Sequence, residues 1–474
     1  MHNLRFENKA VCAECLKFKA TCGTGNACEA IRRNLRSYNG VRPTADGFDC
    51  ALPLSIDSHT ACSFGCLYCF TPNLIQGREK TLKPIGQTSL SFIEGIFSGR
   101  KGIKYEQFRK ILKYDNRNEN GYPCPVQCGA LSDPFDNIER NQGWTLKFIE
   151  LAKKYNQPVR FSTKGNLFLV DEYIKAMEDK PHLFWVAFSI ISSDDEIIKK
   201  IDKRAPPTSE RIECMRRLSA IGVKTSLRFR PIIPGISDST KNHPKAWKDL
   251  IDMAADAGAK AISAETVFLP GGMTKDLKKR WLEIEKISGK PLIKIYKSFG
   301  VNQSCIRPSY IWTEEIITKI AKHAKARGMA VGISSPDWKQ LNDYGCCCGI
   351  SPEDPVFGNW QRKNATNALV RARDGEIKEI TSKDIIPEWA YDFPLLGVVN
   401  MGVGPKTVYN KHHLTWADKL KEIWNTVEKE RSPLNYFQGA LIPTRKIGNE
   451  IVYKYKGLPL RSNIDNTPYW NVKE

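Results

Sequence analysis

Residues 51–335 alternate short apolar runs with longer amphipathic stretches, and this alternation is the strongest constraint on the fold. The apolar runs have the length and composition of buried strands, and the stretches between them have helical spacing. The expected strands cover 51–57, 124–133, 158–164, 183–191, 223–233, 260–269 and 329–335. Strands that alternate with helices form βαβ units around a parallel sheet. We therefore predict an α/β fold with a full or partial (β/α) barrel, for which a flat doubly wound sheet is the alternative.

Sequence of a different character lies on both sides of this region. Residues 1–50 contain several closely spaced cysteines. Beyond residue 350 the alternation stops, and an amphipathic helix expected at 415–430 precedes aromatic-rich, strand-like sequence. We predict three parts, namely a cysteine-rich N-terminal segment at 1–50, the barrel at 51–350 and a C-terminal accessory region at 351–474.

The chain of 474 residues carries a formal net charge of +20. This charge favours an anionic partner, with nucleic acid as the first candidate, although a well-solvated basic surface has the same composition. The N-terminus lacks the apolar core of a signal peptide, and no run of 18 uncharged apolar residues occurs. We expect a soluble, cytoplasmic protein without a membrane partner.

Most of the 15 cysteines are clustered. Closely spaced cysteines in a long chain indicate metal or cluster ligands in a reducing compartment rather than a disulfide framework. Cys62, Cys66 and Cys69 follow the first expected strand with the spacing C-x3-C-x2-C. Structural zinc and ordinary iron–sulfur clusters use four protein ligands. Three thiolates can instead hold three irons of a cubane and leave the fourth iron open to a substrate or cofactor.

This motif, "ACSFGCLYCF" with Tyr68 before the last cysteine, resembles the radical S-adenosylmethionine (SAM) superfamily. Segments across roughly residues 50–270 resemble the branch that contains spore photoproduct lyase and the DNA repair photolyases, namely 129–140, 159–165 and 187–238. The resemblance implies that the three cysteines hold a 4Fe–4S cluster whose open iron binds the methionine part of SAM. It also implies that an external donor supplies the electron that cleaves SAM, and that the resulting 5′-deoxyadenosyl radical abstracts hydrogen from the substrate.

The resemblance further implies cofactor-binding roles for five residues. Tyr68 contacts the adenine, and Ser132 and Asp133 meet the methionine amino group. Lys164 offers a cation to the methionine carboxylate. Arg204, in the R-A-P element, is a second candidate for this carboxylate because a guanidinium pairs with it in bidentate fashion. The same residue types also serve as ordinary strand-end and capping residues.

Ribose hydroxyls also need polar partners, and the resemblance assigns Ser189 and Ser192 to them. Spore photoproduct lyases use a cysteine on the strand before the S-D element as a hydrogen donor, and here Ala130 occupies roughly that place. Cys128 lies two residues earlier on the same strand face. It is therefore our candidate catalytic residue.

Two further cysteine groups are not features of spore photoproduct lyase. One comprises Cys12, Cys15, Cys22 and Cys28. These four thiols can close around zinc or an auxiliary iron–sulfur cluster, or remain reduced without a metal. The other comprises Cys346, Cys347 and Cys348, of which at most two easily bind one cluster because consecutive residues point in different directions. Cys305, Cys124 or Cys128 would complete that second metal site.

Arg228 and Arg230 alternate along one expected strand, so both point to the same face. If that face is the barrel interior, the two buried charges need anions. A phosphate or carboxylate of a substrate would satisfy them. Internal ion pairs with Glu265 or Asp133 are the alternative.

The leading hypothesis is a radical SAM enzyme that acts on nucleic acid, by repair or by base modification. The first alternative is a radical SAM enzyme that modifies a peptide or a small metabolite with the help of auxiliary clusters. The second alternative is a non-catalytic zinc protein that binds nucleic acid. Because a fold does not determine the substrate, the basic charge alone favours the first hypothesis over the second.

Overall fold

The computed structural model describes residues 36–38, 40–44, 46–71, 86–270, 273–297, 305–306, 310–394, 414–429 and 431–457. The four cysteines at 12–28 lie outside these residues, and the metal site expected there stays a prediction. None of the described helices has the length and apolar character needed to cross a bilayer.

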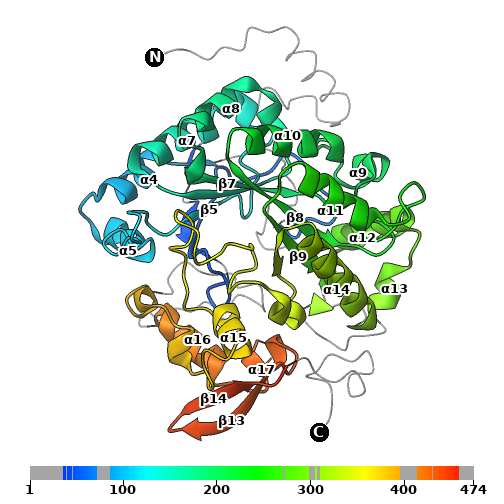
Figure 1. Ribbon diagram of the computed structural model, residues 1–474. Coiled ribbons are helices and arrows are strands. Elements are labelled where there is room, and N and C mark those ends of the chain that lie inside the picture. The colour runs from blue at the N-terminus through cyan, green and yellow to red at the C-terminus, as the bar shows by residue number, and fades with distance from the viewer. Residues whose placement is uncertain are drawn as a thin grey trace.

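An eight-stranded sheet forms the centre of the molecule, in the order β12-β9-β8-β7-β6-β5-β3-β2 (Figure 1). Its strands are β2 (Val41–Pro43), β3 (Leu54–Ile56), β5 (Val126–Cys128), β6 (Val159–Thr163), β7 (Phe184–Ser189), β8 (Lys224–Ile232), β9 (Ala261–Thr266) and β12 (Ala330–Ile333). All neighbours pair in parallel except β2, which is antiparallel to β3. Because β2 and β12 do not pair with each other, the sheet stays open. The predicted α/β barrel is thus confirmed as a partial one.

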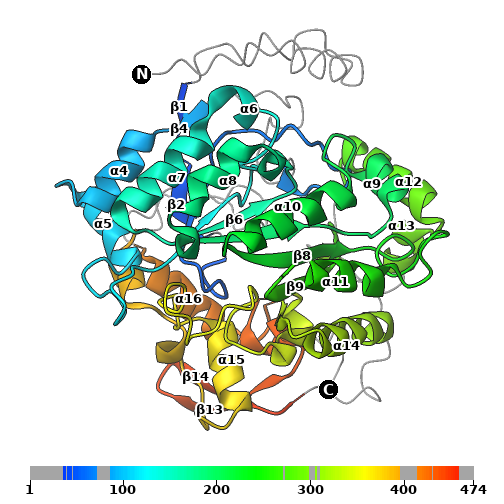
Figure 2. The ribbon, with the colours of Figure 1, turned by 45° about the horizontal axis from the view of Figure 1, so that its top comes forward.

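Helices follow most of the parallel strands and lie along one face of the sheet (Figures 1 and 2). They are α4 (Leu90–Ser98), α5 (Ile103–Ile111), α6 (Glu139–Gln142), α7 (Trp144–Tyr155), α8 (Asp171–Glu178), α9 (Asp195–Ile201), α10 (Thr208–Ala220), α11 (Ala246–Asp256), α12 (Lys275–Ser288), α13 (Leu292–Lys297) and α14 (Tyr310–Ala326). Helix α7 illustrates the pattern, because it buries Trp144, Phe148, Ile149 and Ala152 at helical spacing.

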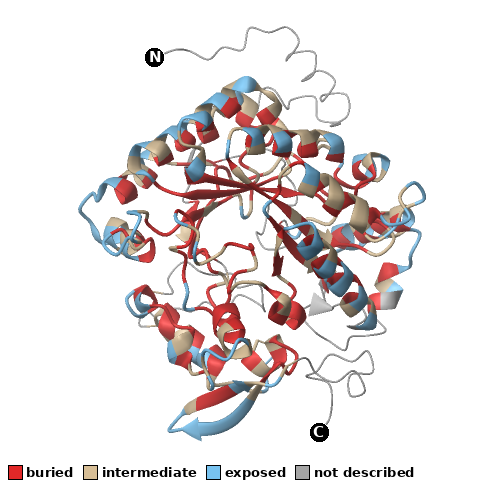
Figure 3. Ribbon diagram, viewed as in Figure 1, coloured by how far each residue is buried: buried red, intermediate tan, exposed pale blue. Residues whose placement is uncertain are grey.

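We call the helix-covered side of the sheet the outer face and the opposite side the inner face. Phe161 of β6 lies on the outer face, with its ring centroid 6.1 Å from that of Phe148 in α7. Trp185 of β7 lies on the inner face, where its ring meets Phe357 edge-on at 5.5 Å. Because alternate residues of a strand point to opposite faces, this contact also assigns Arg160, which pairs with Trp185, to the inner face. The central strands are buried on both faces (Figure 3).

Strand β5 is shorter than the strand expected at 124–133, because the chain turns sharply after Cys128. Gly129 has φ of +91°, a conformation that favours glycine. A Cβ atom at this position would lie 2.5 Å from the carbonyl oxygen of Ser162. The turn carries the following residues across the end of β6, where the candidate site lies.

Residues beyond 350 cover part of the inner face and share one hydrophobic core with the sheet. Their elements are α15 (Ala365–Arg373), α16 (Trp416–Trp424), α17 (Pro433–Tyr436), β13 (Leu441–Ile447) and β14 (Glu450–Tyr455). Three two-stranded sheets complete the described residues, namely β1 (Arg36–Tyr38) with β4 (Gly86–Thr88), β10 (Leu269–Pro270) with β11 (Cys305–Ile306), and β13 with β14. The division at residue 350 remains a prediction.

A buried ion pair fastens the C-terminal region to the barrel. Asp49, 5% exposed, pairs with Lys339, 1% exposed, and also accepts hydrogen bonds from Thr366 and from the hydroxyl of Tyr436. Helix α16 ends earlier than the expected 415–430, because Asn425 turns its side chain to accept a hydrogen bond of 2.8 Å from the backbone N–H of Ile451 in β14.

Candidate active site

The segment that contains Cys62, Cys66 and Cys69, which we call the cysteine loop, follows β3 and is fastened at three points. The N–H of Ser63 donates to Asp136 Oδ2 at 2.7 Å. The N–H of Leu67 donates to the carbonyl of Ile201, at the end of α9, at 3.0 Å. Arg280 of α12 donates to the carbonyl of Cys69 at 3.0 Å. Contacts from three separate elements thus fix the path of the loop.

Arg204 lies directly against the outside of this loop. Gly65 has φ of +63°, and a Cβ atom on it would lie 2.2 Å from Nη2 of Arg204. Only glycine therefore fits between the first two cysteines with the guanidinium in this place. Arg204 supports the loop from outside, a position that the sequence did not predict.

Burial raises the pKa values of two candidate ligands of the loop, Cys62 and Cys66. Burial, and then Asp136, Asp133 and Cys66, raise the pKa of Cys62. Burial and Asp202 raise the pKa of Cys66, against a lowering by Lys164. Thiols of this kind must lose their protons when a metal binds, so binding is coupled to proton release.

The donor set fits an iron–sulfur cluster better than one ion. Among the described side chains, no three His, Cys, Asp or Glu residues converge on a point where one metal ion could bind. In a cluster each cysteine binds a different iron. Cys62, Cys66 and Cys69 come from one fastened loop, and the first two are near enough for Cys66 to affect the pKa of Cys62. These three cysteines would hold the cluster.

A buried group of charges lies beside Cys66. Asp202, fully buried, accepts a hydrogen bond of 2.6 Å from the Tyr68 hydroxyl and ion pairs of 3.2 Å from Lys164 and 3.0 Å from Arg211. Burial alone would raise the pKa of Asp202, but Lys164 and Arg211 outweigh it and lower the pKa to about 2. Lys164 Nζ also donates to the Tyr68 hydroxyl at 2.5 Å and to the carbonyl of Ser189 at 3.5 Å.

Asp202 and Arg211 were missed in the sequence analysis. The signal for Asp202 was its place two residues before Arg204 in "KKIDKRAP", within a segment that carries the family resemblance. Arg211 is fully buried in α10. In the sequence it is one cation on an amphipathic helix, and nothing there distinguishes it from an exposed arginine.

Asp133 and Ser132 lie at the crossing from β5 to β6. Asp133 accepts from the Thr163 hydroxyl at 2.7 Å and from the N–H of Lys164 at 2.6 Å. Ser132 donates its N–H to Asp57 at 3.1 Å. Burial raises the pKa of Asp133, although these hydrogen bonds oppose the rise. The structure therefore brings Asp133 close to both Cys62 and Lys164.

Two predicted residues do not join this group. The hydroxyl of Ser192, fully buried, accepts from the N–H of Asp194 at 3.3 Å within its own turn. Cys128 pairs in register with Phe161 and therefore lies on the outer face, in the hydrophobic core. The catalytic role predicted for Cys128 has no support from this position. Its neighbour Gln127 points to the inner face instead.

The three consecutive cysteines lie at the inner face. The carbonyl of Cys347 accepts from the Ser263 hydroxyl at 2.6 Å, and its Sγ lies 3.6 Å from Arg230 Nη2. Cys50 is close enough for Cys347 and Cys348 to act on it, since burial, followed by these two thiols, raises the pKa of Cys50 to about 12. Cys124 and Cys128 lie elsewhere, and the side chain of Cys305 is outside the described residues. The auxiliary metal site at Cys346, Cys347 and Cys348 stays a prediction.

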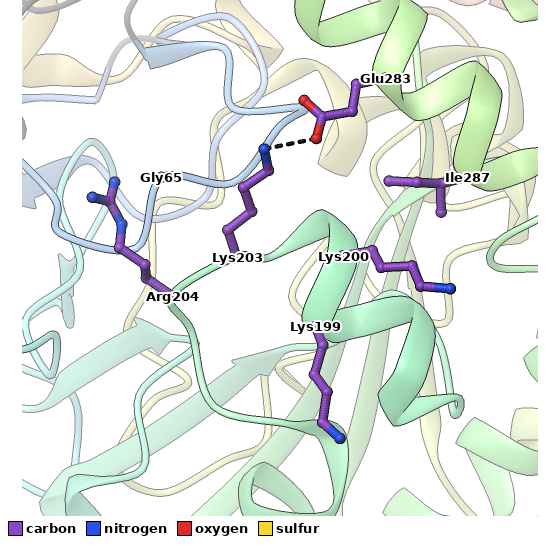
Figure 4. Close-up of a pocket in the computed structure, with 7 residues that line it drawn as sticks. All are labelled: Gly65, Lys199, Lys200, Lys203, Arg204, Glu283 and Ile287. Carbon is purple, nitrogen blue, oxygen red and sulfur yellow. Dashed lines mark ion pairs between the residues drawn. The ribbon is translucent and has the colours of Figure 1, made fainter. Parts of the chain in front are cut away.

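A basic groove of about 600 Å³ opens beside the cysteine loop (Figure 4). It is lined by Gly65, Lys199, Lys200, Lys203, Arg204, Glu283 and Ile287. Lys203 pairs with Glu283 at 2.7 Å, and Lys199 pairs with Glu196 at 2.6 Å. Four cations, two of them paired with Glu283 and Glu196, give this groove a net positive field.

Comparisons with known proteins agree with this geometry. The family model described as Radical SAM superfamily matches residues 141–243. No curated protein matches the chain. Similar solved structures include a cysteine-to-serine variant of spore photoproduct lyase, with 17% identity, a TM-score of 0.43, and coverage of 63% of this chain and 79% of that one. A second variant of that enzyme, with bound AdoMet and dinucleoside spore photoproduct, has 18% identity, a TM-score of 0.42, and coverage of 61% and 79%. Coproporphyrinogen III oxidase from Escherichia coli has 11% identity, a TM-score of 0.24, and coverage of 62% and 60%.

The family model assigns residues 141–243 to the radical SAM superfamily, which confirms the radical SAM resemblance seen in the sequence and indicates an enzyme.

Proposed function

We propose that this enzyme holds a 4Fe–4S cluster on Cys62, Cys66 and Cys69, cleaves SAM reductively there, and removes hydrogen from a nucleic-acid substrate. The observation that carries the proposal is the cysteine loop beside the buried group of Tyr68, Lys164 and Asp202. When bound, the cluster supplies the electron, received from an external donor, that breaks the carbon–sulfur bond of SAM. The reaction on the substrate is repair or base modification.

The chain's own residues position the cofactor and exclude water. Lys164 is held by Asp202 and Tyr68, so its ammonium is fixed at the end of β6, where it can meet a carboxylate. Asp133 is aligned by Thr163 and by the backbone of Lys164, which suits it to an amino group. The ten cysteines whose side chains the structure describes are free, which supports a cytoplasmic, reducing environment.

Reductive SAM cleavage by the full-length protein, reconstituted with iron and sulfide without oxygen, is the direct test. We expect a brown protein that releases 5′-deoxyadenosine when dithionite is added, because three thiolates leave one iron open. The product is measured by chromatography against a sample without reductant. A colourless protein that contains zinc and releases no 5′-deoxyadenosine would contradict the proposal.

The proposed nucleic-acid substrate is supported by the basic groove next to the cysteine loop. Lys199, Lys200, Lys203 and Arg204 line this groove (Figure 4). Gly65, which lies between Cys62 and Cys66 in the sequence, also lines this groove. The net charge of +20 adds a long-range attraction for polyanions.

A double variant, Lys199→Gln with Lys200→Gln, tests this part of the proposal. Each phosphate contact contributes about 0.9 to the salt slope for duplex DNA and about 0.7 for a single strand. We therefore expect the slope of log K against log salt to fall by roughly 1.4 to 1.8 in fluorescence anisotropy titrations. The control is Lys319→Gln with Lys322→Gln on α14, which should leave the slope unchanged. Equal slopes for both double variants would assign the nucleic acid to another surface.

A further inference from the structure

The inner face of the sheet carries a row of small residues. Ser162, Ala187, Ser226 and Ala261 lie next to one another across β6, β7, β8 and β9, as the strand registers show. Long cationic side chains lie in the neighbouring rows. The row of Arg160 lies towards the start of the strands, and the row of Arg228 lies towards their end. The small side chains thus lie between two rows that carry guanidinium groups.

Among the described residues, Arg160 has buried donors that no acceptor meets. Its side chain is buried, with 3% of the residue exposed, and its Nη1 donates to Gln127 at 2.6 Å and to Ser162 at 3.1 Å. Its Nε and Nη2 are buried without a hydrogen-bond partner. The same holds for Nε1 of Trp185 and Oγ of Ser226. An unpaired buried guanidinium is costly, and almost all of these groups are donors. The missing partner is therefore an acceptor.

The local charge points to an anion. Arg228 bonds only the Ser189 hydroxyl among the described residues, at 3.2 Å, and neither Arg228 nor Arg160 has an ion pair there. Arg230 takes the one nearby carboxylate, Glu265, at 3.5 Å. Burial, followed by Arg230 and Arg160, lowers the pKa of Arg228 to about 10. Three guanidiniums thus share a single carboxylate.

We propose that Arg160 and Arg228 form a binding site for one anionic group, a phosphate or a carboxylate, on the inner face of the barrel. A guanidinium holds either group by two parallel hydrogen bonds. The site joins the cysteine loop through Ser189, whose hydroxyl accepts from Arg228 and whose carbonyl accepts from Lys164. Assigning the anion to the substrate rests on the proposed function, whereas the site itself does not. If the anion belongs to the substrate, Arg228 is a substrate-binding residue.

Thermal unfolding of the full-length reconstituted protein tests the site with inorganic phosphate and acetate as probes, at constant ionic strength set with chloride. We expect a saturable rise in Tm with at least one probe, because a ligand that binds only the folded state stabilises it. Arg228→Gln should weaken that ligand about tenfold or more, since a buried charge-assisted pair is lost. In chloride alone, Arg228→Gln should keep or raise Tm, because it removes one of three crowded positive charges. The control Arg216→Gln, at an exposed position of α10 paired with Glu213, should behave as wild type.

Each outcome decides between the site and its alternatives. A response to phosphate alone indicates a phosphate-bearing substrate, and a response to acetate alone indicates a carboxylate. If water satisfies the buried donors, wild type and Arg228→Gln will respond equally to both probes, which overturns the proposal. If Arg228 is only structural, Arg228→Gln will lower Tm in chloride and leave probe affinity unchanged, which also overturns it. Arg228→Lys keeps the positive charge but cannot form two parallel hydrogen bonds to the anion. Its affinity for the probe should lie between those of wild type and Arg228→Gln.

The design separates this site from the proposed reaction. Cys62→Ala should bind the probe as wild type does, because the cysteine loop does not line the inner-face row. Failure of SAM cleavage with intact probe binding would overturn the proposed function alone. Loss of the probe response with intact SAM cleavage would overturn the anion site alone.

Discussion

Changing any one of Cys62, Cys66 and Cys69 to alanine is expected to abolish SAM cleavage. Three thiolates hold three irons, and with two thiolates the cluster loses its attachment. The fall in 5′-deoxyadenosine formation should be roughly a thousandfold or more, since enzymatic acceleration of at least about a millionfold depends on this cofactor. The iron content should also fall by about four atoms per chain, the content of one cluster. Iron analysis and chromatography of 5′-deoxyadenosine measure the two effects.

Cys214→Ala is the matched control for these variants. Cys214 is fully buried in α10, where burial raises its pKa to about 12, so it is a thiol of similar environment away from the loop. It should keep the iron content and the activity of wild type. Retained iron and turnover in all three loop variants would rule out the cluster assignment. Because each variant is compared with wild type, a second cluster elsewhere in the chain would not obscure the loss.

The alternation of strands and helices was sufficient to predict the sheet, because a buried parallel strand requires an apolar run of fixed length. It could not predict what covers the inner face. "VRFS" at 159–162 alternates apolar and polar residues, which normally indicates a strand with one face in water. Here the polar side is Arg160 and Ser162, and it is buried on the inner face, near residues from beyond 350. Arg160 was therefore missed.

A short sequence motif was sufficient to predict the site residues that it contains. Contacts between residues that are far apart in the sequence could not be predicted. The cysteine spacing and the alternation of Arg228 and Arg230 are local patterns, and the structure confirms that both arginines point to the inner face. The hydrogen bond between Tyr68 and Asp202 joins residues 134 positions apart, which no periodicity reveals. The proximity of Cys50 to Cys347 is another contact between residues far apart in the sequence. Cys128 shows a further limit, because a correctly predicted strand does not tell which of its faces the site uses, and the catalytic role of Cys128 stays a prediction.

Asp202→Asn should produce the largest loss of stability among single substitutions near the site. Asp202 and Arg211 are both fully buried, and Lys164 is nearly so, with 13% of its side chain exposed. Asp202 is ionised at neutral pH because Lys164 and Arg211, against the effect of burial, hold its pKa at about 2. An amide in its place leaves two buried cations without a counter-charge. Breaking a buried pair in this way costs about 3–5 kcal/mol.

Urea unfolding of the full-length protein at pH 7 measures this loss, with Asp171→Asn as the matched control. Asp171 also pairs with an arginine, Arg217, at 2.5 Å, but its side chain is 73% exposed. An exposed pair contributes only about 0–1 kcal/mol, so the control should stay close to wild type. If Asp202→Asn lost no more stability than Asp171→Asn, the buried charges would not depend on Asp202. That result would mean that the ion pair with Asp202 does not hold Lys164 in its position beside the cysteine loop.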